Sequence, residues 1–189
     1  LAKEGMTFTD AHSPSGVCTP TRYGVITGRY CWRSRLKRGV LGGYSAPLIE
    51  KDRPTVGSVL QKAGYHTAAI GKWHLGMTMT RLKGGKPGKD RWDGDGNVDF
   101  NKPITDSPIT RGFDEYFGVS ASLDMAPYVW IENHRFVQAK LVQQPAVKFP
   151  GFVRQGPRAA DLEFEEGLDV LGERAETFLR RMTKEKKPF

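Results

Sequence analysis

The chain has 189 residues, of which 38% are hydrophobic and 26% are charged. This balance is typical of an ordinary globular domain and excludes a disordered chain. No apolar run approaches the length that is needed to span a bilayer. The formal net charge of +8 favours anionic partners such as nucleic acid, acidic polysaccharide, or sulfated and phosphorylated small molecules. Two cysteines are too few for a disulfide framework, although a Cys18–Cys31 pair stays open.

The first segment, LAKEGMTF, is interpreted as the tail of a helix closed by Gly5 and followed by a strand. Because the chain lacks an initial Met and ends as abruptly in KEKKPF, we expect a fragment of a longer protein. Residues 17–31 start as a loop and become helical, with Pro20 in the first turn and Gly28 near the end. Cations then lie close together, and the conservative interpretation is a solvated face: Arg29, Arg33, Arg35, Lys37 and Arg38.

An α/β unit follows. TVGSVLQKAG, residues 55–64, predicts a helix that stops at Gly64, with four apolar side chains on one face: Val56, Val59, Leu60 and Ala63. HTAAI, residues 66–70, predicts a short buried strand, and GKWHLG is the turn that leaves it. A helix followed by a buried strand predicts the α/β class.

Residues 77–112 are rich in Gly, Pro, Asp and Lys and predict a long loop excursion. Within them DGDGNVD resembles the start of a calcium loop, with acidic or amide side chains at alternate positions: Asp93, Asp95, Asn97 and Asp99. An EF-hand needs Gly sixth and Glu twelfth, where Val98 and Ile104 stand, so a hydrated acidic turn is predicted instead.

The remainder is expected to hold short strands with packed aromatic turns in 113–136, a loop in 146–160 and a helix in 161–184. That helix would place one apolar face on the core: Leu168, Leu171, Ala175, Phe178, Leu179 and Met182.

Four residues are candidates for chemistry. Cys18 precedes a helix start, where free N–H groups and the helix dipole favour an anion and lower the pKa of a thiol. Arg22 lies one turn further on, and Lys72 and His74 follow the predicted strand HTAAI. In parallel α/β sheets ligands bind at the carboxyl ends of strands, and an extended segment would turn Lys72 and His74 to one side. A nucleophile, two cations and an acid/base group are therefore expected to meet on one anionic group. Taken singly, each is more commonly a buried thiol, a structural histidine or a surface charge.

CTPTRYGVITGR, residues 18–29, resembles the first signature of the type I sulfatases, C-x-P-x-R followed by Thr-Gly-Arg, and GKWHLG resembles the second. The flanks FTDAHSPSGVC and RGFDEYFG, and ASLDMAPYVWIENHRF further on, are similar to arylsulfatase segments. The resemblance implies an alkaline-phosphatase-like α/β/α sandwich with a mixed, mainly parallel sheet, truncated at both ends. Residues 1–189 would form part of the N-terminal catalytic domain.

The resemblance further implies that Cys18 is oxidised to formylglycine by a formylglycine-generating enzyme that reads C-x-P-x-R. The hydrated aldehyde attacks the sulfur of a sulfate ester, and its second hydroxyl then lets sulfate leave. Arg22 matches the arginine that holds the formylglycine, Lys72 the lysine that binds formylglycine or sulfate, and His74 the proposed proton acceptor. Thr19 and Thr21 occupy positions taken as permissive. Asp124 is a weaker candidate for the substrate pocket, against a structural turn residue.

The family also implies a divalent cation, usually Ca²⁺ with Mg²⁺ possible, bound by the group derived from Cys18. An Asp pair that should precede LAKEG, and further Asp, Asn, His and Lys residues that should follow KKPF, are not in the chain. The other metal ligands are therefore expected outside it, and the fragment is expected to be inactive alone. By family habit the location would be periplasmic, secreted or lysosomal, with a sulfate-ester substrate and neither nucleic acid nor a membrane span.

Two alternatives stay open. A phosphonate or phosphodiester hydrolase of the same superfamily would use the same nucleophile and metal. A non-catalytic, basic anion-binding domain would keep Cys18 as a thiol and bind through the cations of residues 29–38 in a salt-sensitive manner.

Overall fold

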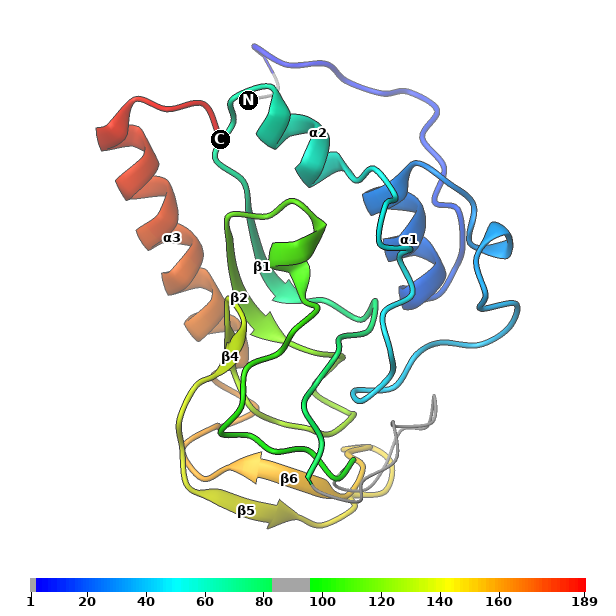
Figure 1. The fold of residues 1–189 in the computed structure, drawn as a ribbon, viewed down its shortest axis with the longest axis vertical. Coiled ribbons are helices and arrows are strands. Elements are labelled where there is room, and N and C mark those ends of the chain that lie inside the picture. Colours follow the sequence, from blue (N-terminus) through cyan, green and yellow to red (C-terminus); the bar gives the residue numbers. More distant parts are fainter. Residues whose placement is uncertain (1–2, 83–95) are drawn as a thin grey trace.

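The computed structural model describes residues 3–82 and 96–189 (Figure 1). Its α-helices are α1 (Cys18–Thr27), α2 (Val56–Lys62) and α3 (Gly167–Glu185), and two 3-10 helices are η1 (Cys31–Arg33) and η2 (Pro108–Arg111). The strands are β1 (Ala68–Lys72), β2 (Glu115–Val119), β3 (Ile131–Glu132), β4 (Arg135–Phe136), β5 (Leu141–Gln144) and β6 (Gly156–Ala159). Asp93 and Asp95 of the acidic motif lie outside the described residues.

The main sheet has the strand order β1-β2-β3-β4. The two five-residue strands β1 and β2 run parallel, with Ile70 opposite Phe117, whereas β3 and β4 join antiparallel through two residue pairs each. The α/β class and the mixed sheet that the sequence predicts are therefore confirmed, and the longest ladder is the parallel one. β5 and β6 form a separate antiparallel pair beyond the end of this sheet (Figure 1).

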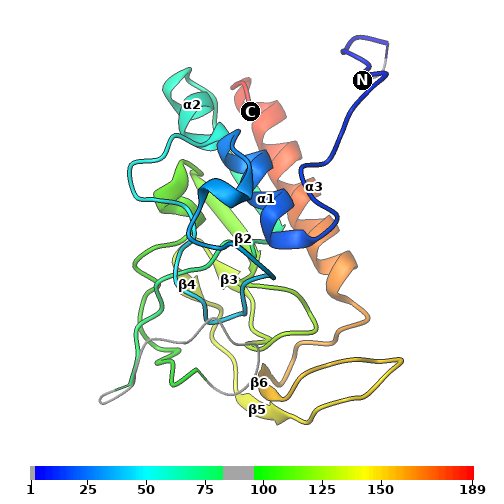
Figure 2. The ribbon, with the colours of Figure 1, turned by 90° about the vertical axis from the view of Figure 1, so that its right-hand side faces the viewer.

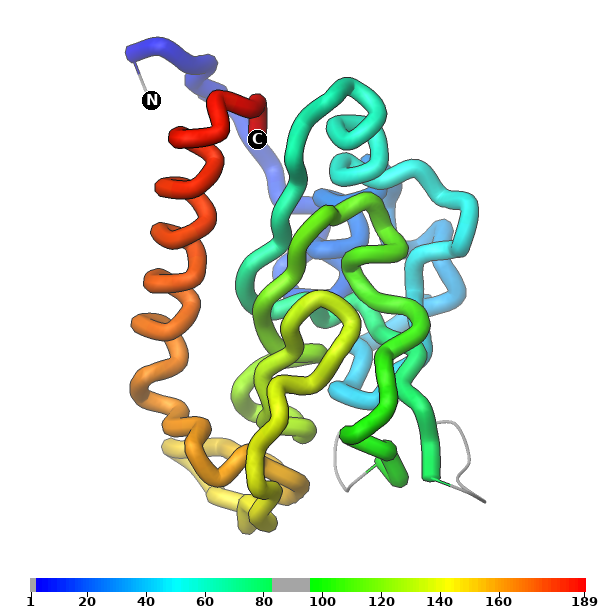
Figure 3. The backbone as a smooth tube through the Cα atoms, turned by 60° about the vertical axis from the view of Figure 1, so that its left-hand side comes forward, coloured from blue at the N-terminus to red at the C-terminus, as the bar shows by residue number. Residues whose placement is uncertain are grey.

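Helices lie on both sides of β1 and β2. α3 runs along one side, and α1 and α2 lie on the other, as Figures 2 and 3 show. On the α3 side the Arg174 guanidinium lies 4.3 Å from the centre of the Phe117 ring and binds Glu132 at 3.1 Å. On the opposite side the Tyr116 hydroxyl donates to the carbonyl of Gly71, and Trp73 meets the Tyr116 ring edge-on. The result is an α/β/α layering.

The helix tail and the strand predicted within LAKEGMTF do not appear in the described part of that segment, because residues 3–17 form turns and irregular backbone. β1 begins and ends two residues later than predicted, so Lys72 is its last residue rather than the second residue beyond it. The loop prediction for 146–160 is also wrong at its end, because β6 pairs with β5. The segment GPRA contains a glycine and a proline, which are both disfavoured in strands, so its sequence does not predict β6. α3 starts only at Gly167.

The apolar faces predicted for two helices are only partly buried. Val56 and Val59 of α2 are 43% and 57% exposed, and the residue that α2 buries is Gly57, which packs on the backbone of Gly112. In α3, Met182 is buried but Leu168 is 82% exposed. Within residues 3–82 and 96–189, no helix is long and apolar enough to cross a membrane.

Gly118 controls how closely β1 and β2 approach each other. A Cβ atom at this position would stand 1.7 Å from the carbonyl oxygen of Gly71, and backbone atoms cannot move aside as a flexible side chain can. Gly118→Ala is expected to lower the free energy of unfolding by about 3 kcal/mol or more, measured by chemical denaturation. Gly172→Ala in α3 is the matched control, because nothing lies within 4 Å of its added methyl group, and it is expected to stabilise by about 0.5–1 kcal/mol. Equal effects of the two substitutions would contradict this account of the strand contact.

Candidate active site

The candidate nucleophile opens a helix. Cys18 is the first residue of α1 and is partly exposed, while Val17 precedes it without a side-chain cap. The first N–H groups of a helix have no partner within the helix, so this end of α1 favours a negatively charged group. α1 ends at Gly28, which adopts a left-handed conformation with φ 66°, as the sequence predicts. Cys18 and Cys31 are both free thiols, so the disulfide that composition left open is not formed.

Arg22, one turn into α1, connects this helix to the end of β1. Its Nη1 donates to the carbonyl oxygen of Lys72 at 2.5 Å. Burial lowers the pKa of Arg22, and Cys18 and Tyr116 act in the opposite direction. A guanidinium keeps its charge in proteins, so α1 brings one fixed cation near Cys18 and holds it against the strand that carries Lys72.

Thr19, in the first turn of α1, connects the helix to two further segments. Its side chain, on a fully buried residue, donates to the carbonyl oxygen of His74 at 3.1 Å and accepts from the backbone N–H of Leu41 at 3.2 Å. The Nε2 of His74 in turn donates to the carbonyl oxygen of Leu41 at 2.6 Å. Sequence reasoning treated Thr19 as permissive and missed Leu41. The hydroxyl of Thr19 next to the cysteine at a helix start could have indicated a role for Thr19. No feature of the sequence around Leu41 indicates its contacts with the site.

His74 is fully buried, and its backbone is left-handed rather than extended. Its φ is 58°, so Lys72 and His74 do not simply face one side as alternate strand residues would. Since Nε2 donates to Leu41, Nδ1 carries the lone pair, and Nδ1 is buried without a hydrogen-bond partner among the residues that the structure describes. Burial lowers the pKa of His74 to about 4, the hydrogen bond to Leu41 opposes this, and the charges of Lys72 and Arg22 add to the lowering. The ring of His74 is therefore neutral, with an unpartnered Nδ1, and it lies near two cations.

The depressed pKa of His74 predicts acid sensitivity. The unfolded chain takes up a proton near pH 6.5, whereas the folded chain does so only near pH 4, so stability is present above pH 6.5 and is lost as the pH falls toward 4. We expect this residue to account for a loss of about 3 kcal/mol over that window. His74→Gln keeps a donor for Leu41 without a titrating ring, and its free energy of unfolding should fall less between pH 6.5 and 4. Parallel pH profiles of the two proteins would contradict this assignment.

Asp124 lies in the turn that follows β2. Burial acts to raise its pKa, but hydrogen bonds from Ser122 and Arg154, together with the charge of Arg154, lower it below the ordinary value. The Arg154 guanidinium pairs with the Asp124 carboxylate, and a guanidinium nitrogen also donates to the Asp124 carbonyl oxygen at 3.1 Å. Asp124 thus ties its turn to the segment before β6. Its charge reaches His74, so it borders the cluster, and its role toward substrate stays a prediction. Sequence reasoning missed Arg154.

The described residues do not complete a metal site. Over 3–82 and 96–189, no three His, Cys, Asp or Glu side chains gather as ligands would. Among the site residues only Cys18, after oxidation, offers the ligand that the resemblance implies. The expectation that further ligands lie beyond the two ends of the chain stays a prediction.

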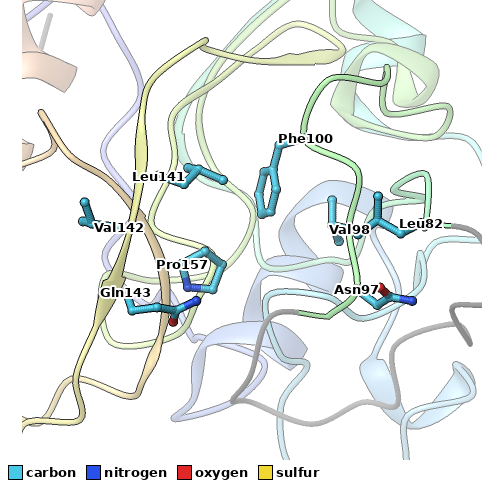
Figure 4. A pocket seen from close by; sticks show the side chains of 8 residues that line it. All are labelled: Leu82, Asn97, Val98, Phe100, Leu141, Val142, Gln143 and Pro157. Atoms are coloured by element: carbon cyan, nitrogen blue, oxygen red, sulfur yellow. The ribbon is translucent and has the colours of Figure 1, made fainter.

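A separate hollow of about 210 Å³ lies between the turn at residues 97–100 and the β5–β6 pair (Figure 4). Two leucines, two valines, a phenylalanine, a proline and the amides Asn97 and Gln143 line it. This lining offers neither a nucleophile nor a titratable group, so the hollow does not compete with the Cys18 cluster as a reaction site.

In this layered fold a helix start and the carboxyl end of a parallel strand converge on the cluster, which is where α/β proteins commonly bind ligands. A family model described as Sulfatase matches residues 1–181, so the chain belongs to the sulfatase family.

Named relatives agree with this assignment. The chain is 37% identical over 137 residues to an N-acetylgalactosamine-6-O-sulfatase of Bacteroides thetaiotaomicron, covering 72% of this chain and 24% of the relative. It is 36% identical over 129 residues to human arylsulfatase G, covering 66% of this chain and 19% of that protein. The chain thus spans about a quarter or less of the length of these two relatives.

Solved structures show the same fold. A Bacteroides thetaiotaomicron structure, whose title concerns the metabolism of multiple glycosaminoglycans, superposes with a TM-score of 0.74 at 26% identity and covers all of this chain and 42% of its own. A Pseudoalteromonas sulfatase superposes with a TM-score of 0.54 at 21% identity, covering 91% of this chain and 32% of its own, which supports the fold alone.

Proposed function

We propose that the protein to which this chain belongs hydrolyses sulfate esters, with Cys18 oxidised to formylglycine as the nucleophile. The observation that carries the proposal is the convergence of Cys18, Arg22 and His74 through the Arg22–Lys72 and Thr19–His74 hydrogen bonds. Hydrated formylglycine supplies one hydroxyl that attacks sulfur and a second whose deprotonation releases sulfate. Cys18 at a helix start fits that group, because the helix end and Arg22 both favour the charge that develops on oxygen.

The remaining residues have distinct roles in this proposal. Arg22 holds the side chain derived from Cys18, and its bond to β1 fixes where that side chain lies. Lys72 supplies a second cation for the sulfate oxygens. His74 accepts a proton at Nδ1, which is free because Nε2 is engaged with Leu41. Proton transfer of this kind contributes roughly 10²–10⁴-fold to a rate.

The proposal includes a divalent cation, Ca²⁺ or alternatively Mg²⁺. Ligands beyond this chain would complete its coordination. The formylglycine-generating enzyme is the proposed partner in maturation, and the proposed location is periplasmic, secreted or lysosomal. Residues 1–189 would then be part of the N-terminal catalytic domain, and we expect them to be inactive alone.

The closest alternative is hydrolysis of a phosphonate or phosphodiester. The full-length protein, co-produced with a formylglycine-generating enzyme, should turn over an aryl sulfate with a higher kcat/KM than the matched aryl phosphonate. A higher kcat/KM for the phosphonate would replace the proposed activity by the alternative. No turnover of either compound, with Cys18 still a thiol, would favour the non-catalytic anion-binding domain.

A further inference from the structure

A continuous stretch of the chain around the candidate nucleophile carries positive charge only. Between residues 11 and 49 there are six Arg or Lys residues and neither Asp nor Glu. Five of the six fall in residues 29–38, which run from the end of α1 through η1 into the segment that follows. We name residues 29–38 the basic strap. Because three residues beyond its end Leu41 bonds to both Thr19 and His74, the strap connects the far end of α1 with the candidate active site.

Two aromatic rings stand on the strap. Tyr30 and Trp32 stack with ring centres 4.0 Å apart and planes 11° from parallel, yet they remain 53% and 62% exposed. The pair therefore presents two adjacent aromatic rings to solvent. Lys37 is held beside it, since its Nζ donates to the carbonyl oxygen of Trp32 at 2.6 Å. Tyr30, Trp32 and Lys37 therefore combine a flat apolar surface with an adjacent ammonium group.

Not all cations of the strap form ion pairs with carboxylates. Arg29 lies 3.9 Å from Glu50, but Arg33 and Arg38 form no ion pair with any residue in the described ranges, and both are exposed. Beside Tyr30 a hollow of about 370 Å³ opens against α1, with Arg29, His12 and Val25 in its lining. That volume lies in the range of small-ligand sites, and Tyr30 belongs both to its lining and to the stacked pair.

We infer that the basic strap is an anchoring surface for a polysaccharide chain that carries several sulfate groups, outside the centre that cleaves one of them. A sugar ring has an apolar face that can lie on an aromatic ring, and its sulfates would meet Lys37, Arg33 and Arg38. Single-stranded nucleic acid would use similar stacking and charge. A sulfated polysaccharide is favoured because the strap leads to a site that, under the proposed function on which this inference rests, takes a sulfate ester.

The test uses the full-length protein with Cys18→Ala, so that ligand binding is measured without turnover. The probe is chondroitin 6-sulfate, compared with its desulfated chain and with single-stranded oligo(dT). Trp32→Ala with Lys37→Ala should weaken the Kd for chondroitin 6-sulfate at least tenfold. The matched pair Phe149→Ala with Lys148→Ala also removes one exposed ring and one exposed lysine, and should change Kd less than twofold.

A second readout separates this inference from the proposed function. With Cys18 intact, both double variants should hydrolyse a small aryl sulfate at a rate within twofold of the unchanged protein. Equal Kd changes in the two double variants, tight binding of the desulfated chain, or equally tight binding of oligo(dT) would overturn the anchoring surface. Absence of aryl sulfate hydrolysis in the unchanged protein would instead overturn the proposed function, whatever the Kd values.

Discussion

Replacing Cys18 by alanine in the full-length protein is expected to lower the kcat for an aryl sulfate at least about 10³-fold, because the nucleophile is removed. The substitution leaves the packing almost unchanged, since Cys18 is partly exposed at the first position of α1. The unfolding free energy should therefore shift by less than about 1 kcal/mol. The measurement is kcat with saturating aryl sulfate after co-production with a formylglycine-generating enzyme.

Cys31 is the matched control for the loss of a thiol. It is 9% exposed in η1, where its Sγ lies 3.7 Å from the Ser34 hydroxyl, and no site residue bonds to it among those described. Cys31→Ala should keep kcat within about twofold and cost about 1–2 kcal/mol of stability. Undiminished turnover by Cys18→Ala would remove Cys18 from the reaction.

Arg22→Ala is expected to lower kcat/KM by about 10²–10³-fold, the range that is found when one donor to a developing anion is lost. It removes a half-buried cation near Cys18 and leaves the Lys72 carbonyl oxygen without its guanidinium partner. Arg22→Lys keeps the charge but not the planar donor pair, so it should recover only part of the rate. Rates are compared per mole of converted Cys18, which separates poor maturation from poor catalysis.

Arg180→Ala is the matched control for the loss of a guanidinium. Arg180 lies on α3 with 73% of its side chain exposed and pairs with Glu176 on the same helix. Its loss should leave kcat/KM unchanged within about twofold. An Arg22→Ala rate equal to that of Arg180→Ala would mean that the contact with Lys72 positions nothing that the reaction needs.

Local patterns predicted most of the elements around the site. Pro20 and Gly28 marked the limits of α1, and the apolar HTAAI segment marked β1 to within two residues. These signals work because helix ends and buried strands have local chemical requirements. The strand at GPRA was missed, because its pairing with β5 is a tertiary contact that no local preference reveals.

The site itself was predictable in its members but not in its connections. Cys18, Arg22, Lys72 and His74 could be named from two short motifs, whereas the Thr19–Leu41–His74 hydrogen bonds depend on a loop that returns more than 20 residues later. The left-handed backbone at His74, with φ 58°, was also not predicted, because residues other than glycine adopt this conformation only rarely. Long-range backbone contacts decide both features.

The most direct test of the central claim is peptide mass spectrometry across Cys18 in the full-length protein, co-produced with a formylglycine-generating enzyme. We expect a peptide in which the Cys18 thiol has been replaced by an aldehyde, together with an unmodified Cys31 peptide. A Cys18 peptide found only as the intact thiol, under conditions in which a known substrate of that enzyme is converted, would contradict it.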